Sequence, residues 1–297
     1  MSTMFHRRLL MALLVSLAFA AFPAFTYANH SWNNYHWART SNPVTLKLGD
    51  NVSNNWDSYL STTASNTSEG GWGLSVVLNT MVATGGTKPR TCKPTSGRVE
   101  VCSEKYGNNG WLGLAQIWIS SNHITQGVVK LNDTYFNTTK YNTAPWRNLV
   151  MCQEVGHTFG LDHQDETFAN TNLGTCMDYT NDPDGTLANP DQKDNQYPNS
   201  HDYEQLETIY GHLDSTTTVG QTVQSGPGKG KLPPAATDPD SDEPVQLGTA
   251  QWGKLIRSTN NGRTELYELD LGRGHKVLTH VIWADPEDQP APARGRR

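Results

Sequence analysis

The chain has 297 residues and a formal net charge of −6 at pH 7, from 29 acidic and 23 basic side chains. Lysine and arginine are not gathered into a basic stripe, which excludes nucleic acid as an expected partner. Beyond the first residues, no segment is long and apolar enough for stable membrane insertion.

The first 28 residues have the pattern of a secretory signal peptide. Two adjacent arginines precede an apolar stretch over residues 9–22, and Thr26 and Ala28 place small residues where a signal peptidase cuts. An uncleaved anchor is the alternative interpretation. We expect a secreted, extracellular protein whose mature part starts near residue 29.

All four cysteines lie in the exported part of the chain. An even number of cysteines in an oxidising compartment predicts two disulfides. Pairing Cys92 with Cys102 would close a short loop, and pairing Cys152 with Cys176 would join two segments of the site discussed below. The two other connectivities remain open.

The first half of the exported chain consists mainly of predicted strands. Four segments alternate apolar and polar residues or are continuously β-favouring, and a helix is expected near residues 56–63. Strands followed by a long helix indicate an α+β domain over residues 29–214, which is large enough for one hydrophobic core. The four strand segments are residues 44–48, 74–78, 114–119 and 128–131.

The next helix has clear start and stop signals. Thr143 is a suitable N-cap, Pro145 lies in the first turn where its missing amide is harmless, and Gly160 can end the helix in a left-handed conformation. Gln153 and His157 are four residues apart, so they point from the same face. A metal site on one helix requires this arrangement.

Residues 153–163 read QEVGHTFGLDH. This run resembles the HExxHxxGxxH motif of the metzincin zinc peptidases, with Gln153 in place of the first histidine. The resemblance implies zinc ligands at His157 and His163, a doubtful third ligand at Gln153, and Glu154 as the general base. In such a site zinc lowers the pKa of a bound water, and the glutamate takes its proton so that hydroxide attacks the scissile carbonyl.

A second segment strengthens the resemblance. Metzincins carry a methionine turn under the metal, and several subfamilies have a tyrosine two residues later that approaches the metal and the oxyanion. Met177 and Tyr179 are similar to this pair in type and in distance from His163. Tyr179 is therefore a second candidate catalytic residue, with plain core packing as the alternative for both side chains.

A final helix is predicted after Asn199, which is a suitable N-cap with Asp202 three positions later. It resembles the helix that closes metzincin domains, and the Leu-Asp-His sequence ending at His163 resembles the matrixin branch. The resemblance covers residues 29–214 and is specific between 143 and 212. It implies a zincin fold: a twisted, mostly parallel sheet with an active-site helix and a C-terminal helix.

The substitution at Gln153 leaves three arrangements open. An amide oxygen is a weaker zinc donor than imidazole, so Gln153 could ligate weakly with help from Tyr179. Alternatively, His201 or another side chain could supply the missing ligand. In the third arrangement the site is metal-free and the domain only binds peptides.

Residues 215–247 are rich in Thr, Gly, Pro, Lys and Asp, which predicts a flexible linker. Residues 248–286 then form a small β-rich module, which we expect either to dock on the main domain or to act as an accessory binding hairpin. Residues 287–297 are expected to be a disordered tail. The hairpin strands are predicted at residues 265–271 and 276–283, around a turn at 272–274.

The leading functional hypothesis is a secreted zinc endopeptidase acting on a protein or peptide substrate. The alternative is a non-catalytic secreted binding protein on the same scaffold. Calcium is a second conceivable cofactor at Asp165 and Glu166, although simple solvation is the favoured interpretation. No cysteine that could block a zinc ion precedes Cys92. The protein is therefore either synthesised in an active form or inhibited in another way.

Overall fold

The computed structural model describes residues 30–68, 70–168, 170–186, 192–220 and 251–289. The predicted signal peptide and most of the predicted linker and tail lie outside these residues. No helix within the described part of the chain is long and apolar enough to cross a membrane.

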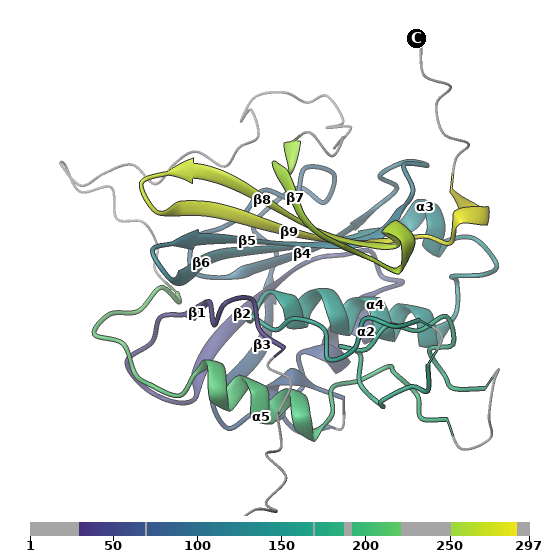
Figure 1. The fold of residues 1–297 in the computed structure, drawn as a ribbon. Helices are drawn as coiled ribbons and strands as arrows, with labels where there is room; N and C mark the ends of the chain where they lie inside the picture. Colours follow the sequence, from purple (N-terminus) through teal and green to yellow (C-terminus); the bar gives the residue numbers. More distant parts are fainter. Residues whose placement is uncertain (1–29, 69, 169, 187–191, 221–250, 290–297) are drawn as a thin grey trace, which may run out of the picture.

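A mixed nine-stranded sheet organises the described residues (Figure 1). The strand order is β3-β2-β4-β6-β5-β9-β8-β7, and β1 also pairs with β6. The architecture is therefore α+β, as expected. The strands are β1 (His36–Trp37), β2 (Val44–Asn51), β3 (Leu78–Thr84), β4 (Val99–Glu104), β5 (Trp111–Ser120), β6 (His123–Asn132), β7 (Lys254–Thr259), β8 (Thr264–Gly272) and β9 (His275–Trp283).

The sheet has a parallel half and an antiparallel half. The pairs formed among β1, β2, β3, β4 and β6 are parallel. From β5 onward every pair is antiparallel. The mostly parallel arrangement expected for the sheet thus describes its core, and the C-terminal strands extend the sheet with antiparallel pairs.

The C-terminal strands dock on the main sheet, which is one of the two arrangements left open by the sequence. Strand β9 runs antiparallel to β5 along its length, from Trp111 opposite Trp283 to Ser120 opposite His275. Strands β8 and β9 match the predicted hairpin closely, whereas β7 was not predicted. The main-chain N–H and C=O groups on this edge of β5, which would otherwise face solvent, form hydrogen bonds with β9.

Helices α2 (Asp57–Thr63), α4 (Ala144–His157) and α5 (Ser200–Ile209) lie on the same side of the sheet in Figure 1. A short helix, α3 (Asp133–Phe136), follows β6. The side chain of Thr143 accepts from the amide of Trp146, and Asn199 forms a full capping box with Asp202. Both predicted N-caps are thereby confirmed, as is the helix expected near residues 56–63.

One predicted strand is displaced. Residues 74–78 were expected to be extended, but Trp72–Leu74 form a 3-10 turn and β3 starts only at Leu78. The hydroxyl of Ser75 accepts a hydrogen bond from the amide of Val77, which fixes a local turn instead of a ladder. Val76 points outward and is 65% exposed. Its β-favouring side chain therefore gave a misleading signal.

Both expected disulfides are present, Cys92–Cys102 and Cys152–Cys176. The first links the loop after β3 to strand β4. The second links helix α4 to the segment that carries Met177. The two bridges use all the cysteines of the chain.

Candidate metal centre

Helix α4 and the turn after it bring two of the predicted ligands together. The helix ends at His157, and Gly160 follows with φ +98°, where a Cβ atom would lie 1.9 Å from the carbonyl oxygen of Tyr35. Only glycine fits this close approach in a left-handed conformation. The turn directs His163 back toward the helix, so that its Nε2 lies 2.9 Å from Nε2 of His157.

A third histidine, His280 on β9, completes the cluster. One ring nitrogen from each of His157, His163 and His280 lies within 4.8 Å of the others. Nδ1 of His280 is 3.1 Å from Oε2 of Glu154, and its Nε2 is 2.8 Å from the hydroxyl of Tyr179. The candidate base, the candidate tyrosine and three imidazoles are therefore in direct contact.

Sequence reasoning missed His280 as a ligand, although it placed this residue on a strand. Its neighbours on the same face, Leu278 and Ile282, are buried, so His280 interrupts an apolar stripe. That interruption, beside a motif lacking one histidine, was the available signal. His201, the candidate named instead, lies with its Nδ1 3.0 Å from Nε2 of His30 and does not belong to the cluster.

Gln153 is buried beside the cluster and is anchored to the methionine turn. Its Nε2 donates a hydrogen bond to the carbonyl oxygen of Cys176 at 2.8 Å. Its Oε1 is buried and has no hydrogen-bond partner among the described residues. An unpartnered buried acceptor is costly unless a cation or a water satisfies it.

The methionine turn packs directly under α4. Met177 is fully buried, and a Cβ atom at Gly156 would lie 2.8 Å from its sulfur. The ring of Tyr179 lies 4.1 Å from that of His163 and stacks at 5.1 Å on Phe168. The structure therefore brings both residues of the predicted turn to the cluster.

Burial disfavours the charged forms of Glu154, His157 and His280. It raises the pKa of Glu154 well above its usual value, and it lowers the pKa values of His157 and His280 well below theirs, an effect strengthened by the other histidines. Nδ1 of His157 is 2.9 Å from the carbonyl oxygen of Leu161 and donates to it. Nε2 of His157 therefore carries a lone pair directed into the cluster.

These donors fit a transition-metal ion. Three imidazoles suit zinc and poorly suit calcium, which prefers oxygen ligands. Oε1 of Glu154, like that of Gln153, is buried without a hydrogen-bond partner among the described residues. Three protein ligands leave one coordination position for water, as in catalytic zinc sites.

The cluster is closed from solvent. Gln153, Glu154, His157 and His280 are all 0% exposed. Trp32 stacks on the ring of His157 at 4.7 Å and also lines a groove of about 370 Å³ on the outside. Trp32 therefore separates the groove from the candidate ligands.

Ion pairs from Arg257 on strand β7 hold the loop that carries His163. Nη1 of Arg257 donates to Oδ2 of Asp162 at 2.7 Å, and its Nε lies 3.2 Å from Oε1 of Glu166. The carboxylate of Asp165 accepts from the amide of Thr167 and from Asn170. These carboxylates are thus engaged within the chain, and ligand atoms of Asp162, His163 and Glu166 lie within 4.8 Å of one another.

No protein-family model matches the chain. A search of curated proteins likewise finds no relative. The metzincin resemblance accordingly rests on the residues of the chain itself.

Proposed function

We propose that the protein is a secreted zinc-dependent endopeptidase whose ligands are His157, His163 and His280. The observation that supports it best is the contact of His280 with Glu154 and Tyr179, inside the cluster that the motif predicts. A histidine from the C-terminal strand thereby takes the role lost at Gln153. The two disulfides agree with export to an oxidising compartment.

A bound zinc ion would polarise a peptide carbonyl and lower the pKa of a coordinated water. The positive charge of a bound zinc ion would favour the carboxylate form of Glu154. Oε1 would then be the atom available to accept the proton, because Oε2 already contacts Nδ1 of His280. Burial holds the pKa of Tyr179 well above its usual value, so its hydroxyl stays protonated. To donate to an oxyanion, the hydroxyl would turn away from Nε2 of His280, which would then be free to bind the metal. Gln153 keeps the methionine turn in place through Cys176.

A substrate can reach the cluster only if the structure around it opens. Strand β9 occupies the edge of β5, where an extended peptide would otherwise pair, and Trp32 blocks the approach from the groove. The same closure supplies a means of latency without a blocking cysteine. Movement of Trp32 would join the groove to the cluster while leaving His280 on the sheet.

The proposal is tested by zinc content and casein cleavage of the full exported chain. We expect wild type to bind a zinc ion at this cluster and to cleave, Glu154→Gln to bind this ion without cleaving, and His280→Ala to lose both this ion and cleavage. Trp32→Ala should raise cleavage if access limits it. Cleavage that survives Glu154→Gln would overturn the mechanism, and zinc binding unchanged in His280→Ala would overturn the ligand assignment.

A non-catalytic zinc-binding scaffold is the second candidate, and the complete burial of Glu154 and His280 is the observation that favours it. It predicts one tightly held zinc ion at this cluster, and no cleavage by either wild type or Trp32→Ala. The Gln153→His variant separates the two further. A scaffold would gain zinc affinity alone, whereas an enzyme would change its cleavage rate.

A further inference from the structure

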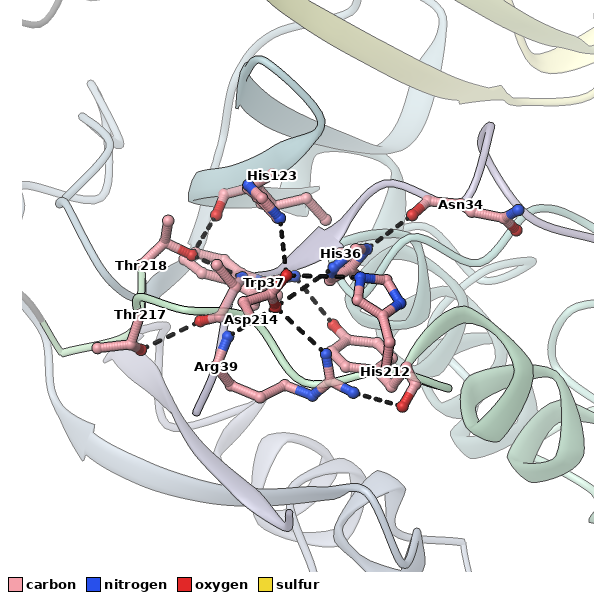
Figure 2. A network of polar contacts seen from close by, with 12 residues as sticks. Asn34, His36, Trp37, Arg39, His123, His212, Asp214, Thr217 and Thr218 are labelled. Carbon is pink, nitrogen blue, oxygen red and sulfur yellow. Dashed lines mark hydrogen bonds and ion pairs between the residues drawn. The ribbon is translucent and has the colours of Figure 1, made fainter. Parts of the chain in front are cut away.

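A second histidine cluster surrounds Asp214, as Figure 2 shows. His36 comes from β1, His123 from the start of β6, and His212 and Asp214 from the segment after α5. The Nε2 atoms of the three histidines lie 3.5, 3.1 and 3.5 Å from the carboxylate of Asp214. Three distant segments of the chain thus converge on one acidic group.

His36 is the most informative member of this cluster. It is 4% exposed, and its Nδ1 donates to the carbonyl oxygen of Asn34 at 2.8 Å. In the neutral ring, Nε2 then carries a lone pair, and it is buried with no hydrogen-bond partner among the described residues. That lone pair faces Oδ2 of Asp214, another acceptor, at 3.5 Å. A cation between the two atoms removes the conflict.

The spacing of the donors fits a zinc ion. Zinc–nitrogen and zinc–oxygen bonds of about 2.0–2.1 Å in a tetrahedron place neighbouring ligand atoms about 3.3 Å apart. Nε2 of His36 lies 3.5 Å from Oδ2 of Asp214, and Nε2 of His212 lies 3.5 Å from Oδ1 of the same carboxylate. The two rings are nearly perpendicular, with centroids 4.9 Å apart. Ligand atoms of His36, His212 and Asp214 all lie within 4.8 Å of one another.

We propose that His36, His212 and Asp214 form a second zinc site, separate from the candidate centre on α4. The hydrogen bond from Nδ1 of His36 fixes the ring in the orientation that metal-binding histidines commonly have. His123, the backbone amide of Arg39 and the Arg39 guanidinium contact the oxygens of Asp214 from outside the ligand set, with Nη1 of Arg39 3.4 Å from Oδ2. The fourth position of the ion is left for water.

A metal ion at this site would hold the C-terminal end of the main domain, which carries His212 and Asp214, against the sheet. After Asp214 the chain runs along β1, with the amide of Thr218 bonded to Ala38 and its hydroxyl bonded to the carbonyl oxygen of Ile124. Figure 2 shows Thr217 and Thr218 beside these strands. A metal ion bound between His36 and His212 would hold the same segments together, which gives it a structural role independent of any peptidase activity.

The test is zinc stoichiometry of the full exported chain after equilibration with zinc chloride, together with cobalt absorption spectra. His212→Ala is the main variant, because its side chain is 63% exposed and its loss does not threaten folding. His36→Asn is the second variant. His275→Ala is the control, since His275 lies on β9 outside both clusters, and His163→Ala reports on the other centre.

We expect His212→Ala and His36→Asn each to lose one zinc ion per chain relative to wild type, with loss of one tetrahedral cobalt spectrum. His275→Ala should lose none. His163→Ala should retain the ion that His212→Ala loses, whether or not the α4 centre binds zinc. The proposal is overturned if His212→Ala and His36→Asn, folded by circular dichroism, bind as much zinc as wild type.

Discussion

The two histidine clusters differ in the chain segments that contribute their residues and in the solvent exposure of those residues. The cluster of His157, His163 and His280 is buried to 6% exposure or less, and two of its members come from one local motif. The cluster around Asp214 draws on three separate segments and includes a histidine that is 63% exposed. Burial under a strand suits a tightly held ion, whereas an exposed ligand suits an ion that exchanges with solvent. The predictions below test the contacts that hold each cluster in place.

The largest effect is expected from removing the disulfide beside the buried cluster. Cys152 and Cys176 close a loop with a sequence separation of 24, for which loop-closure entropy gives about 3.5 kcal/mol of stability. Their joint replacement by serine should lower the free energy of unfolding by this amount and weaken zinc binding at the buried cluster, because Cys176 also holds Gln153. Urea denaturation and zinc titration measure both effects.

The double variant Cys92→Ser and Cys102→Ser is the matched control. It opens a loop with a sequence separation of 10, worth about 3 kcal/mol, in a region remote from the motif. Stability should fall while zinc binding at both clusters persists. Equal loss of zinc from the two double variants would contradict a specific role for Cys152 and Cys176.

Acid should destabilise the chain through His30, which contacts the loop before His163. Burial lowers the pKa of His30 from 6.5 to about 4. The unfolded chain therefore binds a proton first, and the contribution of His30 to stability is present above pH 6.5 and lost as the pH falls toward 4. Between pH 7 and pH 5 the loss is about 2 kcal/mol.

The variant His30→Gln should lack this part of the pH dependence. Free energies of unfolding from urea titrations at pH 7 and pH 5 give the difference for each protein, so that other titrating groups largely cancel. If the free energy of unfolding of wild type falls no more between pH 7 and pH 5 than that of the variant, His30 is not the source of the pH dependence.

A smaller effect is expected at Arg257. Its ion pairs with Asp162 and Glu166 hold the loop of His163, but Arg257 is 36% exposed and the interaction is partly screened. Arg257→Ala should weaken zinc binding at the buried cluster by about tenfold, or about 1.4 kcal/mol. Lys276→Ala is the control, because it breaks an ion pair with Glu268 on the same hairpin. Similar affinities for the two variants would exclude this role for Arg257.

The smallest effect is expected at His123. It bonds Asp214 but is not one of the three proposed ligands, and the backbone of Arg39 also holds that carboxylate. His123→Ala should keep the full zinc stoichiometry and lower the affinity of the second cluster by less than about tenfold. Loss of a whole zinc ion would make His123 a ligand and require revision of the ligand set.

The local features of the fold could be read from the sequence because short-range physics determines them. Thr143 and Asn199 cap their helices, and the turn at Gly160 needs a left-handed glycine. The hairpin of β8 and β9 was predicted from its period-two pattern. The partner of that hairpin was not, because the pairing of β9 with β5 joins residues far apart in the chain and no local pattern specifies it.

The same limit explains what was missed in the sites. Glu154, His157 and His163 lie within one motif, so their proximity follows from a helix and a turn. His280 reaches them only through the register of β9. His36, His212 and Asp214 share no spacing at all, and their convergence depends on how β1 and the segment after α5 lie on the sheet.

The position of His280 on the last strand has a consequence for the order of assembly. Glu154 and His280 are 126 positions apart, and contacts of such long separation form late in folding because their loop-closure entropy must be overcome first. The buried centre is therefore incomplete until β9 has paired with β5. Capture of a metal ion there would report that the chain has finished folding.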